Sequence, residues 1–313
     1  MSLSNYKCTG KVPHKHLLNL LDYSKTDLYE ILGLALKLKK KQQDGVRHEY
    51  LAGKTLAMIF SKSSTRTRVS FEQGIKQLGG SALFLSSNDI QLGRGETIAD
   101  TARTLARYGI DGVMIRTHKQ TDVEELARYG NMPVINGLTD DFHPCQALAD
   151  YLTVYEKLGK FDGVKLTYFG DGNNVAHSLM IAGAKLGVTV CICSPEGFGP
   201  DPAITARAQK MGTVTVTTDI EAAIKNCDAV YSDVFFSMGQ APDPAKEKAL
   251  MPYQVNAALM AKANKNAIFL HCLPAHRGEE VTAEVIDGPQ SVVFDQAENR
   301  LHAQKAVMCL LMK

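Results

Sequence analysis

A hydroxyl-rich and basic segment follows the first apolar run of the sequence. The run TLAMIF covers residues 55–60, and residues 64–68 read STRTR before a stretch with helical periodicity. The N-terminus of a helix offers unpaired backbone N–H groups and the positive end of the helix dipole. Guanidinium groups can bind a phosphate through two parallel hydrogen bonds. The segment therefore predicts a phosphate site, and the competing interpretation is an ordinary capped helix with solvated arginines.

Hydrogen-bonding side chains follow the later apolar runs. The run GVMIR ends in Arg116, and the run PVIN precedes His143 and Gln146. Arg116 and His143 can donate hydrogen bonds, and the amide of Gln146 can both donate and accept them. A His before a Pro is by itself more often a surface helix cap, so that alternative stays open.

Hydrogen-bond acceptors follow the run AVYS. Asp233 and Ser237 lie in the segment DVFFSMG, where a carboxylate and a hydroxyl can both accept hydrogen bonds. On composition alone, this segment could also be a simple connection between elements.

Two nucleotide-binding motifs are disfavoured by their spacing. Gly53-Lys54-Thr55 looks like the end of a P-loop, but His48 stands where the first Gly belongs, and the segment precedes its strand. Gly170-Asp171-Gly172 follows a strand, as a dinucleotide-binding loop does. However, Val175 replaces the third Gly, and the next strand ends in Ser-Pro without an acid for the ribose.

A zinc site is also disfavoured. His271, Cys272 and His276 are possible ligands, but no second ligand cluster accompanies them in the sequence. Their spacing is also not that of the H-E-x-x-H motif. The pair Cys191 and Cys193 is predicted to lie on one side of a buried strand, as part of the core.

The elements that position these residues repeat in a regular order. Short apolar runs alternate with amphipathic stretches, which is the βαβ pattern of parallel sheets covered on both faces. Ligands of such sheets bind beyond the carboxyl ends of the strands, where the polar segments above lie. The strands are predicted at 55–60, 81–85, 112–116, 133–136, 165–169, 188–193, 213–216, 229–232, 267–270 and 292–294.

Three helices can be placed from the residues. The first runs from Ser24, which has capping-box spacing to Asp27, to Gly45, and the others cover 143–160 and 297–313. The predicted fold class is α/β, with two doubly wound parallel-sheet (Rossmann-like) domains joined by helices and a C-terminal helix that packs back on the first domain. We expect domains at 1–150 and 151–296, with 297–313 returning to the first and Arg300 near the start of that helix.

Composition and charge narrow the class of protein. A chain of 313 residues that is 45% hydrophobic can build two cores of roughly 150 residues each. A net charge of +2 is too balanced for a general nucleic-acid or membrane-surface binder, and no apolar run approaches the ~18 residues of a membrane helix. The seven cysteines form no disulfide framework, which favours a reducing compartment. We expect a cytoplasmic protein that binds neither nucleic acid nor membranes.

Taken together, the motifs resemble those of the aspartate/ornithine carbamoyltransferase family over almost the whole chain. Residues 64–68 resemble its Ser-x-Arg-Thr-Arg loop, and residues 143–146 resemble its His-Pro-x-Gln element. Residues 233–239 and 271–274 resemble the Asp-x-x-x-Ser-Met-Gly and His-Cys-Leu-Pro motifs of ornithine-specific members, although Phe235 replaces a frequent Trp. The resemblance implies transfer of the carbamoyl group of carbamoyl phosphate to the δ-amine of L-ornithine, giving L-citrulline and phosphate. It leaves open the biosynthetic or degradative direction of arginine metabolism.

The resemblance also implies roles for individual residues. The catalytic residues would be Arg116, His143, Asp233 and Cys272. Carbamoyl phosphate would be bound by Ser64, Thr65, Arg66, Thr67, Gln91, Arg116, His143, Gln146, Cys272, Leu273 and Arg300. Ornithine would be bound by Asn174, Asp233, Ser237 and Met238. Cys272 would contact the reacting amine, and its proton acceptor is left open among Cys272, Asp233 and the leaving phosphate.

The resemblance further implies a homotrimer or a multiple of trimers, with sites near subunit interfaces and neither cofactor nor metal. The loop 86–100, which carries Gln91, would reach a neighbouring subunit, and the role of Arg94 stays open. Two alternatives remain. A carbamoyltransferase for another amine such as putrescine is disfavoured by the Ser-Met-Gly motif. A non-catalytic ligand-binding relative should have lost one of Arg66, Arg116, His143 and Cys272, all of which are present.

Overall fold

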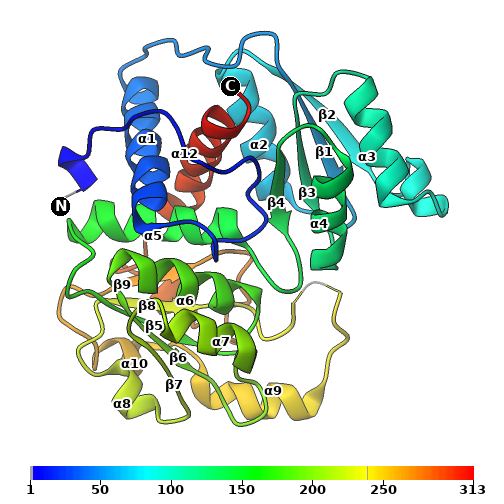
Figure 1. Ribbon diagram of the computed structural model, residues 1–313. Coiled ribbons are helices and arrows are strands. Elements are labelled where there is room, and N and C mark those ends of the chain that lie inside the picture. Colours follow the sequence, from blue (N-terminus) through cyan, green and yellow to red (C-terminus); the bar gives the residue numbers. More distant parts are fainter. Residues whose placement is uncertain (1–2, 238) are drawn as a thin grey trace. The chain divides into compact units, whose positions relative to one another are not determined.

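The computed structural model describes residues 3–237 and 239–313 (Figure 1). The chain divides into two compact units. Unit 1 contains the described residues up to Leu148 together with Arg300–Lys313, and unit 2 contains Ala149–Asn299. Two helices pass from one unit into the other, α5 (Pro144–Leu158) and α12 (Val293–Leu311). Both therefore contribute side chains to each unit.

Unit 1 is built on a parallel four-stranded sheet in the order β2-β1-β3-β4. In the register of this sheet, the last residues of β1 and β3, Phe60 and Arg116, lie opposite each other. The carboxyl ends of the central strands thus meet at one edge. The elements are η1 (Leu3–Asn5), α1 (Lys25–Gln43), β1 (Thr55–Phe60), α2 (Thr65–Gln77), β2 (Ser81–Ser86), η2 (Gln91–Arg94), α3 (Ile98–Arg107), β3 (Gly112–Arg116), α4 (Gln120–Tyr129) and β4 (Val134–Leu138).

Helices cover both faces of the unit 1 sheet, as its apolar strands require. On one face, α3 and α4 pack through Ala102, Val123 and Leu126. On the other face, α12 lies between α1 and α2 (Figure 1). A Cβ added to Gly112 in β3 would lie 2.8 Å from the sulfur of Met312, so the chain just after α12 is in direct contact with the sheet. The predicted packing of the C-terminal helix on the first domain is confirmed.

The contact between α12 and its neighbours includes a buried ammonium group. Lys305 is 0% exposed, and its Nζ donates to Gln42 Oε1 in α1 at 2.9 Å and to Gln77 Oε1 in α2 at 2.8 Å. His48 Nε2 lies 3.2 Å from the same nitrogen. Within the described residues, no carboxylate forms an ion pair with it. Burial lowers the pKa of Lys305 to about 8.

Unit 2 is built on a parallel five-stranded sheet in the order β7-β6-β5-β8-β9. Ser232 at the end of β8 lies opposite both Phe169 of β5 and His271 of β9, so three strands end together. The elements are β5 (Lys165–Phe169), α6 (Asn174–Leu186), β6 (Thr189–Cys193), α7 (Pro202–Gln209), β7 (Val214–Thr217), α8 (Ile220–Ile224), β8 (Ala229–Ser232), α9 (Pro244–Leu250), η3 (Met251–Tyr253), α10 (Ala257–Met260), β9 (Ile268–His271) and α11 (Ala283–Ile286).

The core of unit 2 also has a layer on each face of the sheet. Residues of α8, α10 and α11 pack on one face with Cys191 and Cys193, which confirms that this cysteine pair belongs to the core. On the other face, α6 approaches the sheet closely. A Cβ added to Gly183 would lie 2.4 Å from Val190 and 2.2 Å from the hydroxyl of Tyr151 in α5. The two parallel sheets confirm the predicted fold class.

Most predicted elements lie within a few residues of the observed ones. Ser24 caps α1, and its backbone N–H donates to Asp27 Oδ2 at 2.7 Å, which confirms the capping box. The strand predicted at 292–294 is wrong, because α12 begins at Val293 and only Ser291 forms an isolated bridge, to Phe269. Three apolar residues are too few to distinguish a strand from a helix start. Arg300 consequently lies about two turns inside α12 and not near its beginning.

Across the described part of the chain, no helix combines the length and apolar character needed to span a bilayer. All seven cysteines are free thiols. Five of them are buried, and Cys8 and Cys272 are half-buried. Of these two, only Cys272 follows the carboxyl end of a strand.

Candidate active site

The loop between β1 and α2 has the predicted local structure. Ser64 is the N-cap of α2, and its Oγ accepts a hydrogen bond from Thr67 N at 3.2 Å. Thr65 is exposed, Arg66 is half-buried and Thr67 is buried. The hydroxyl oxygen of Thr67 accepts from Ser64 Oγ at 3.2 Å. The loop therefore places three hydroxyl groups and a guanidinium group around the N-terminus of a 13-residue helix.

Three further predicted residues lie at the same edge of the unit 1 sheet. Arg116 ends β3 and is buried. His143 directly precedes α5, and its carbonyl oxygen accepts from Gln146 N at 3.1 Å in the first helical turn. Arg300 joins them from α12, since its Nη1 donates to Gln146 Oε1 at 2.6 Å. Its Nη2 also donates to Thr67 Oγ1 at 3.3 Å, so one buried guanidinium connects α2, α5 and α12.

The electrostatics of this edge are strongly positive. Burial holds the pKa of His143 well below its usual value, and the positive charges of Arg300, Arg116 and Arg66 lower it further. His143 is therefore neutral at physiological pH and can donate one ring N–H without competing for an anion's charge. A buried histidine surrounded by three guanidinium groups fits a site for an anionic ligand with a polar carbonyl group.

Gln91 stands apart from these residues. It begins the short helix η2 and is exposed, and its backbone oxygen accepts from Glu96 N at 3.1 Å. No hydrogen bond between its side chain and the other predicted residues is present in the described part of the chain. The structure of a single chain therefore does not bring Gln91 into the unit 1 site.

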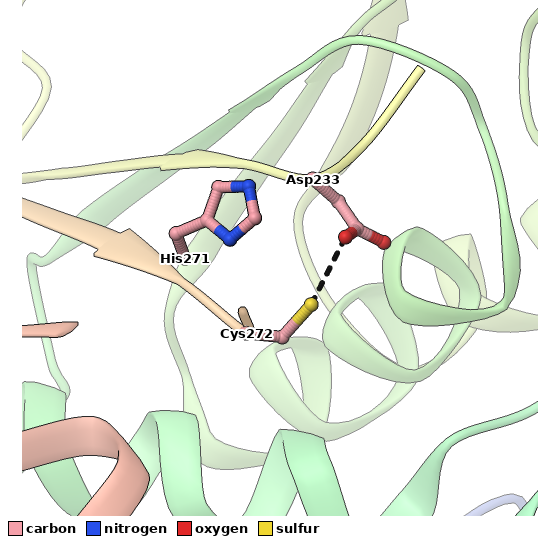
Figure 2. A group of neighbouring side chains, drawn as sticks. All are labelled: Asp233, His271 and Cys272. Carbon is pink, nitrogen blue, oxygen red and sulfur yellow. Dashed lines mark hydrogen bonds between the residues drawn. The ribbon is translucent and has the colours of Figure 1, made fainter. Parts of the chain in front are cut away.

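The unit 2 site is centred on a buried carboxylate that follows β8. Asp233 Oδ1 accepts from Cys272 Sγ at 3.0 Å and from Val234 N at 2.9 Å. Its Oδ2 accepts from Asn173 Nδ2 at 2.7 Å. Figure 2 shows the Cys272 side chain directed toward Asp233 from the end of β9. The two residues predicted to meet the amine are thus hydrogen-bonded to each other.

A buried histidine and glutamate support the loop that carries Cys272. His271 Nε2 lies 3.1 Å from Glu280 Oε1, and both side chains are fully buried. His271 Nδ1 accepts from Leu273 N at 2.9 Å, and Glu280 Oε1 accepts from His276 N at 2.7 Å. Leu273 has a positive φ of 58°. The His271–Glu280 pair therefore holds the backbone of this loop at two points, Leu273 and His276.

Of the remaining predicted residues of unit 2, the structure describes Asn174 and Ser237. Asn174 is the first residue of α6 and is buried, and Ser237 is half-buried in the segment after β8. Met238 lies outside the described residues. Asn173 was missed by sequence reasoning, although it caps α6 and contacts Asp233 directly. An Asn immediately before a helix is a known capping signal, but nothing local indicates its second contact.

Two groups of side chains have donor atoms close enough for a metal ion. Within the described residues, one atom each from Asp233, His271 and Cys272 lies within 4.8 Å of the others, and the same holds for His276, Glu279 and Glu280. Both ring nitrogens of His271 already take part in hydrogen bonds. A metal bound there would have to displace Leu273 N or Glu280 from the histidine.

Known proteins match this chain along nearly its full length. Residues 15–156 match the profile described as aspartate/ornithine carbamoyltransferase, carbamoyl-P binding domain, and residues 162–311 match the corresponding Asp/Orn binding domain. An ornithine carbamoyltransferase of Anoxybacillus flavithermus is 56% identical over 98% of this chain and 100% of its own length. An anabolic ornithine carbamoyltransferase of Pyrococcus furiosus is 54% identical over 95% of this chain and 96% of its own.

The fold agrees with these sequence matches. The solved structure of an ornithine carbamoyltransferase from Pyrococcus furiosus superimposes with a TM-score of 0.91 at 52% identity, covering 100% of this chain and 98% of that one. The chain contains both domains of the family. Residues of the family motifs follow the carboxyl ends of strands in both sheets. The chain belongs to the aspartate/ornithine carbamoyltransferase family.

Proposed function

We propose that the protein is an enzyme that transfers the carbamoyl group of carbamoyl phosphate to the δ-amine of L-ornithine, giving L-citrulline and phosphate. The observation that carries this proposal is the hydrogen bond from Cys272 to the buried carboxylate of Asp233. A member of the family that acts on aspartate would need basic groups there, because its second substrate carries an extra carboxylate. A thiol paired with a carboxylate instead suits a substrate that presents amines.

Carbamoyl phosphate binding is assigned to unit 1, in the domain proposed at 1–150 with 297–313. The backbone and hydroxyl groups of Ser64, Thr65 and Thr67 and the guanidinium of Arg66 would bind the phosphate. Arg116 and neutral His143 would donate to the carbamoyl oxygen as negative charge develops on it. Gln146 would accept from the carbamoyl NH2 group, and Arg300 positions that amide oxygen. The resemblance also assigns Cys272 and Leu273 to carbamoyl-phosphate binding.

Ornithine binding is assigned to unit 2, in the domain proposed at 151–296. Asp233, with Asn174, Ser237 and Met238, would hold the α-amino-acid end of the substrate, and the Cys272 thiol would contact the δ-nitrogen. The neutral δ-amine then attacks the carbonyl carbon, and the tetrahedral intermediate expels phosphate. The proton of the amine passes to Cys272, to Asp233 or to the leaving phosphate. The residues in place require no cofactor for this reaction.

A homotrimer, or a multiple of trimers, is part of the same proposal. The edge strand β2 and the neighbouring helix α2 expose the apolar side chains of Val69, Leu83 and Phe84, which are 58%, 45% and 38% exposed. An exposed apolar edge of this kind favours burial against another subunit. Gln91, which is isolated in one chain, would then reach the site of a neighbour. Sedimentation equilibrium would test this, since a purely monomeric mass would contradict it.

The proposed role lies in arginine metabolism, and the anabolic relative named above supports the biosynthetic direction. The free thiols of all seven cysteines support a reducing compartment such as the cytoplasm.

Carbamoyl transfer to a panel of amines, measured as phosphate released from carbamoyl phosphate, tests the proposed function. L-Ornithine should be used with a kcat/KM at least about 100-fold above those of putrescine, L-lysine and N-acetylornithine, because the site's buried acceptor would be left unpaired or misaligned by the others. Preference for putrescine would contradict the assignment of Asp233 and Ser237 to the α-amino-acid end. Absence of product with every amine would contradict the enzymatic proposal itself.

A further inference from the structure

A buried ammonium group lies where several loops of unit 2 meet. Lys246, in α9, is buried, and its Nζ donates to Asp171 Oδ2 at 2.8 Å and to Gln240 Oε1 at 3.2 Å. The same nitrogen lies 5.8 Å from the ring centroid of Phe198 and 5.7 Å from that of Phe236. An ammonium beside aromatic rings gains a further electrostatic attraction. Lys246 thus contacts three loops that are separate in the sequence.

One end of this arrangement is held firmly. The backbone oxygen of Asp171 accepts from Tyr168 OH at 2.8 Å. The next residue, Gly172, donates its N–H to Phe198 O at 2.8 Å, and a Cβ added to it would lie 2.1 Å from Pro200 N. Such an approach leaves no room for displacement. The carboxylate of Asp171 is therefore a fixed point against which another segment can be held.

The other end is the segment that carries Ser237. Gln240 Oε1, which accepts from Lys246, also accepts from Ser237 N at 3.2 Å. Gln240 N donates in turn to Ser237 O at 3.0 Å. Gln240 is exposed and Ser237 is half-buried. The hydrogen bond from Lys246 to Gln240 Oε1 therefore ties Gln240, and through it Ser237, to the fixed carboxylate of Asp171.

The pairing also sets the charge of the unit 2 site. Burial raises the pKa of Asp171, Lys246 counters that effect, and the nearby charge of Asp233 raises it again. With Lys246 bound to it, Asp171 is part of a neutral pair. Asp233 is then the carboxylate left to attract the ammonium of a substrate.

We propose that Lys246 is a positioning residue for the amine substrate. By bridging Asp171 and Gln240, it holds the turn that carries Ser237 in the place where Ser237 meets the charged end of that substrate. Lys246 itself does not touch the substrate. The inference rests on the proposed function, because it assumes that Ser237 binds the amino acid.

Lys246→Met tests the bridge, because Met keeps an unbranched apolar side chain of similar length but removes the ammonium. The matched control is Lys248→Met, which removes an exposed charge from the same helix. Loss of a hydrogen bond that involves a charged group should raise the KM for ornithine roughly tenfold to 100-fold. The Kd for carbamoyl phosphate should change less than about twofold, because its ligands in unit 1 lie outside the bridge. An unchanged KM in Lys246→Met, or an equal rise in Lys248→Met, would overturn the proposal.

A second variant separates positioning from general loss of stability. Asp171→Asn removes the carboxylate that Lys246 binds. The double variant Asp171→Asn/Lys246→Met removes both members of the ion pair, so neither charge is left unpaired. Because both residues act through one bridge, the KM of the double variant should stay within about twofold of that of Lys246→Met alone. If the increases in KM caused by Asp171→Asn and by Lys246→Met multiplied in the double variant, the proposal would be overturned.

Hydrogen exchange gives a readout that does not depend on catalysis. In the free protein, Lys246→Met should speed exchange of the amides in residues 234–245, whereas Lys248→Met should not. Equal protection in the two variants would overturn the bridge. A wild-type protein that makes no citrulline would refute the proposed function alone, and hydrogen exchange would still decide whether the bridge holds this segment.

Discussion

Replacing Asp233 by Asn converts one carboxylate oxygen into an NH2 group at a position where the surrounding groups are donors. Cys272 Sγ and Val234 N donate to Oδ1, and Asn173 Nδ2 donates to Oδ2. An Asn at 233 has a single side-chain oxygen, which can accept either from Cys272 and Val234 or from Asn173, but not from both sides. With its oxygen toward Cys272, its NH2 group would face the NH2 group of Asn173 across the present 2.7 Å separation.

Asn173 cannot turn its amide to relieve this conflict. Its Oδ1 accepts from Val175 N at 2.9 Å and from Ala176 N at 3.3 Å, and turning it would remove the cap of α6. The smallest loss is therefore one hydrogen bond to a charged acceptor plus one buried donor without an acceptor, together about 3 kcal/mol. The attraction for the substrate's ammonium is lost in addition. We expect kcat/KM for ornithine to fall by at least about 100-fold.

The assay measures citrulline formation at saturating carbamoyl phosphate. Glu196→Gln is the matched control, because it removes an exposed acid of the same unit and should leave kcat/KM within about twofold. Urea unfolding of both variants shows how much of the loss reflects stability. If Asp233→Asn kept kcat/KM within about threefold of the wild type, the assignment of Asp233 to the amine substrate would be refuted.

Three further predictions concern other parts of the molecule. Arg66→Lys keeps the charge but loses the paired geometry, so kcat/KM for carbamoyl phosphate should fall by about 100-fold; near-normal turnover would contradict the phosphate assignment. Cys272→Ser should raise the KM for ornithine while calorimetry shows an almost unchanged carbamoyl-phosphate affinity; the reverse pattern would be inconsistent with the proposed division of the site. Burial lowers the pKa of Lys305 to about 8 in the folded state, below the 10.5 of an exposed lysine. The unfolded state therefore binds more protons between these values, and the contribution of Lys305 to stability should increase with pH from about 8 to 10.5. Urea unfolding of the wild type should show this increase relative to Lys305→Met, and parallel curves for the two proteins would contradict it.

The parts of the site that depend on local signals could be predicted from the sequence. Ser64 caps a helix because a hydroxyl precedes a periodic apolar stretch, and Arg116 ends a strand because the apolar run stops there. Parallel pairing then brings the carboxyl ends of such strands to one edge. The resemblance to a family added the expected roles, which local signals do not contain.

Contacts between residues distant in the chain could not be predicted in this way. Arg300 binds Gln146 across 154 positions, and Asn173 binds Asp233 across 60, and neither pair has a sequence pattern that connects its members. The prediction of a strand at 292–294 is wrong because three apolar residues suit a strand as well as the first turn of a helix. Tertiary packing, which buries Val293 and leaves Phe294 73% exposed, decides between them.

The position of α12 has a consequence for how the protein is made. Residues 300–313 supply part of the unit 1 core, including the Met312 side chain that lies against Gly112. A ribosome adds about 5–20 residues per second, so the first 148 residues wait roughly 8–30 s for that missing piece. Unit 2 is continuous in sequence and has all its residues before then. The part translated second is therefore the first that can fold completely, and the side of β3 that Met312 contacts stays uncovered until residues 300–313 have been made.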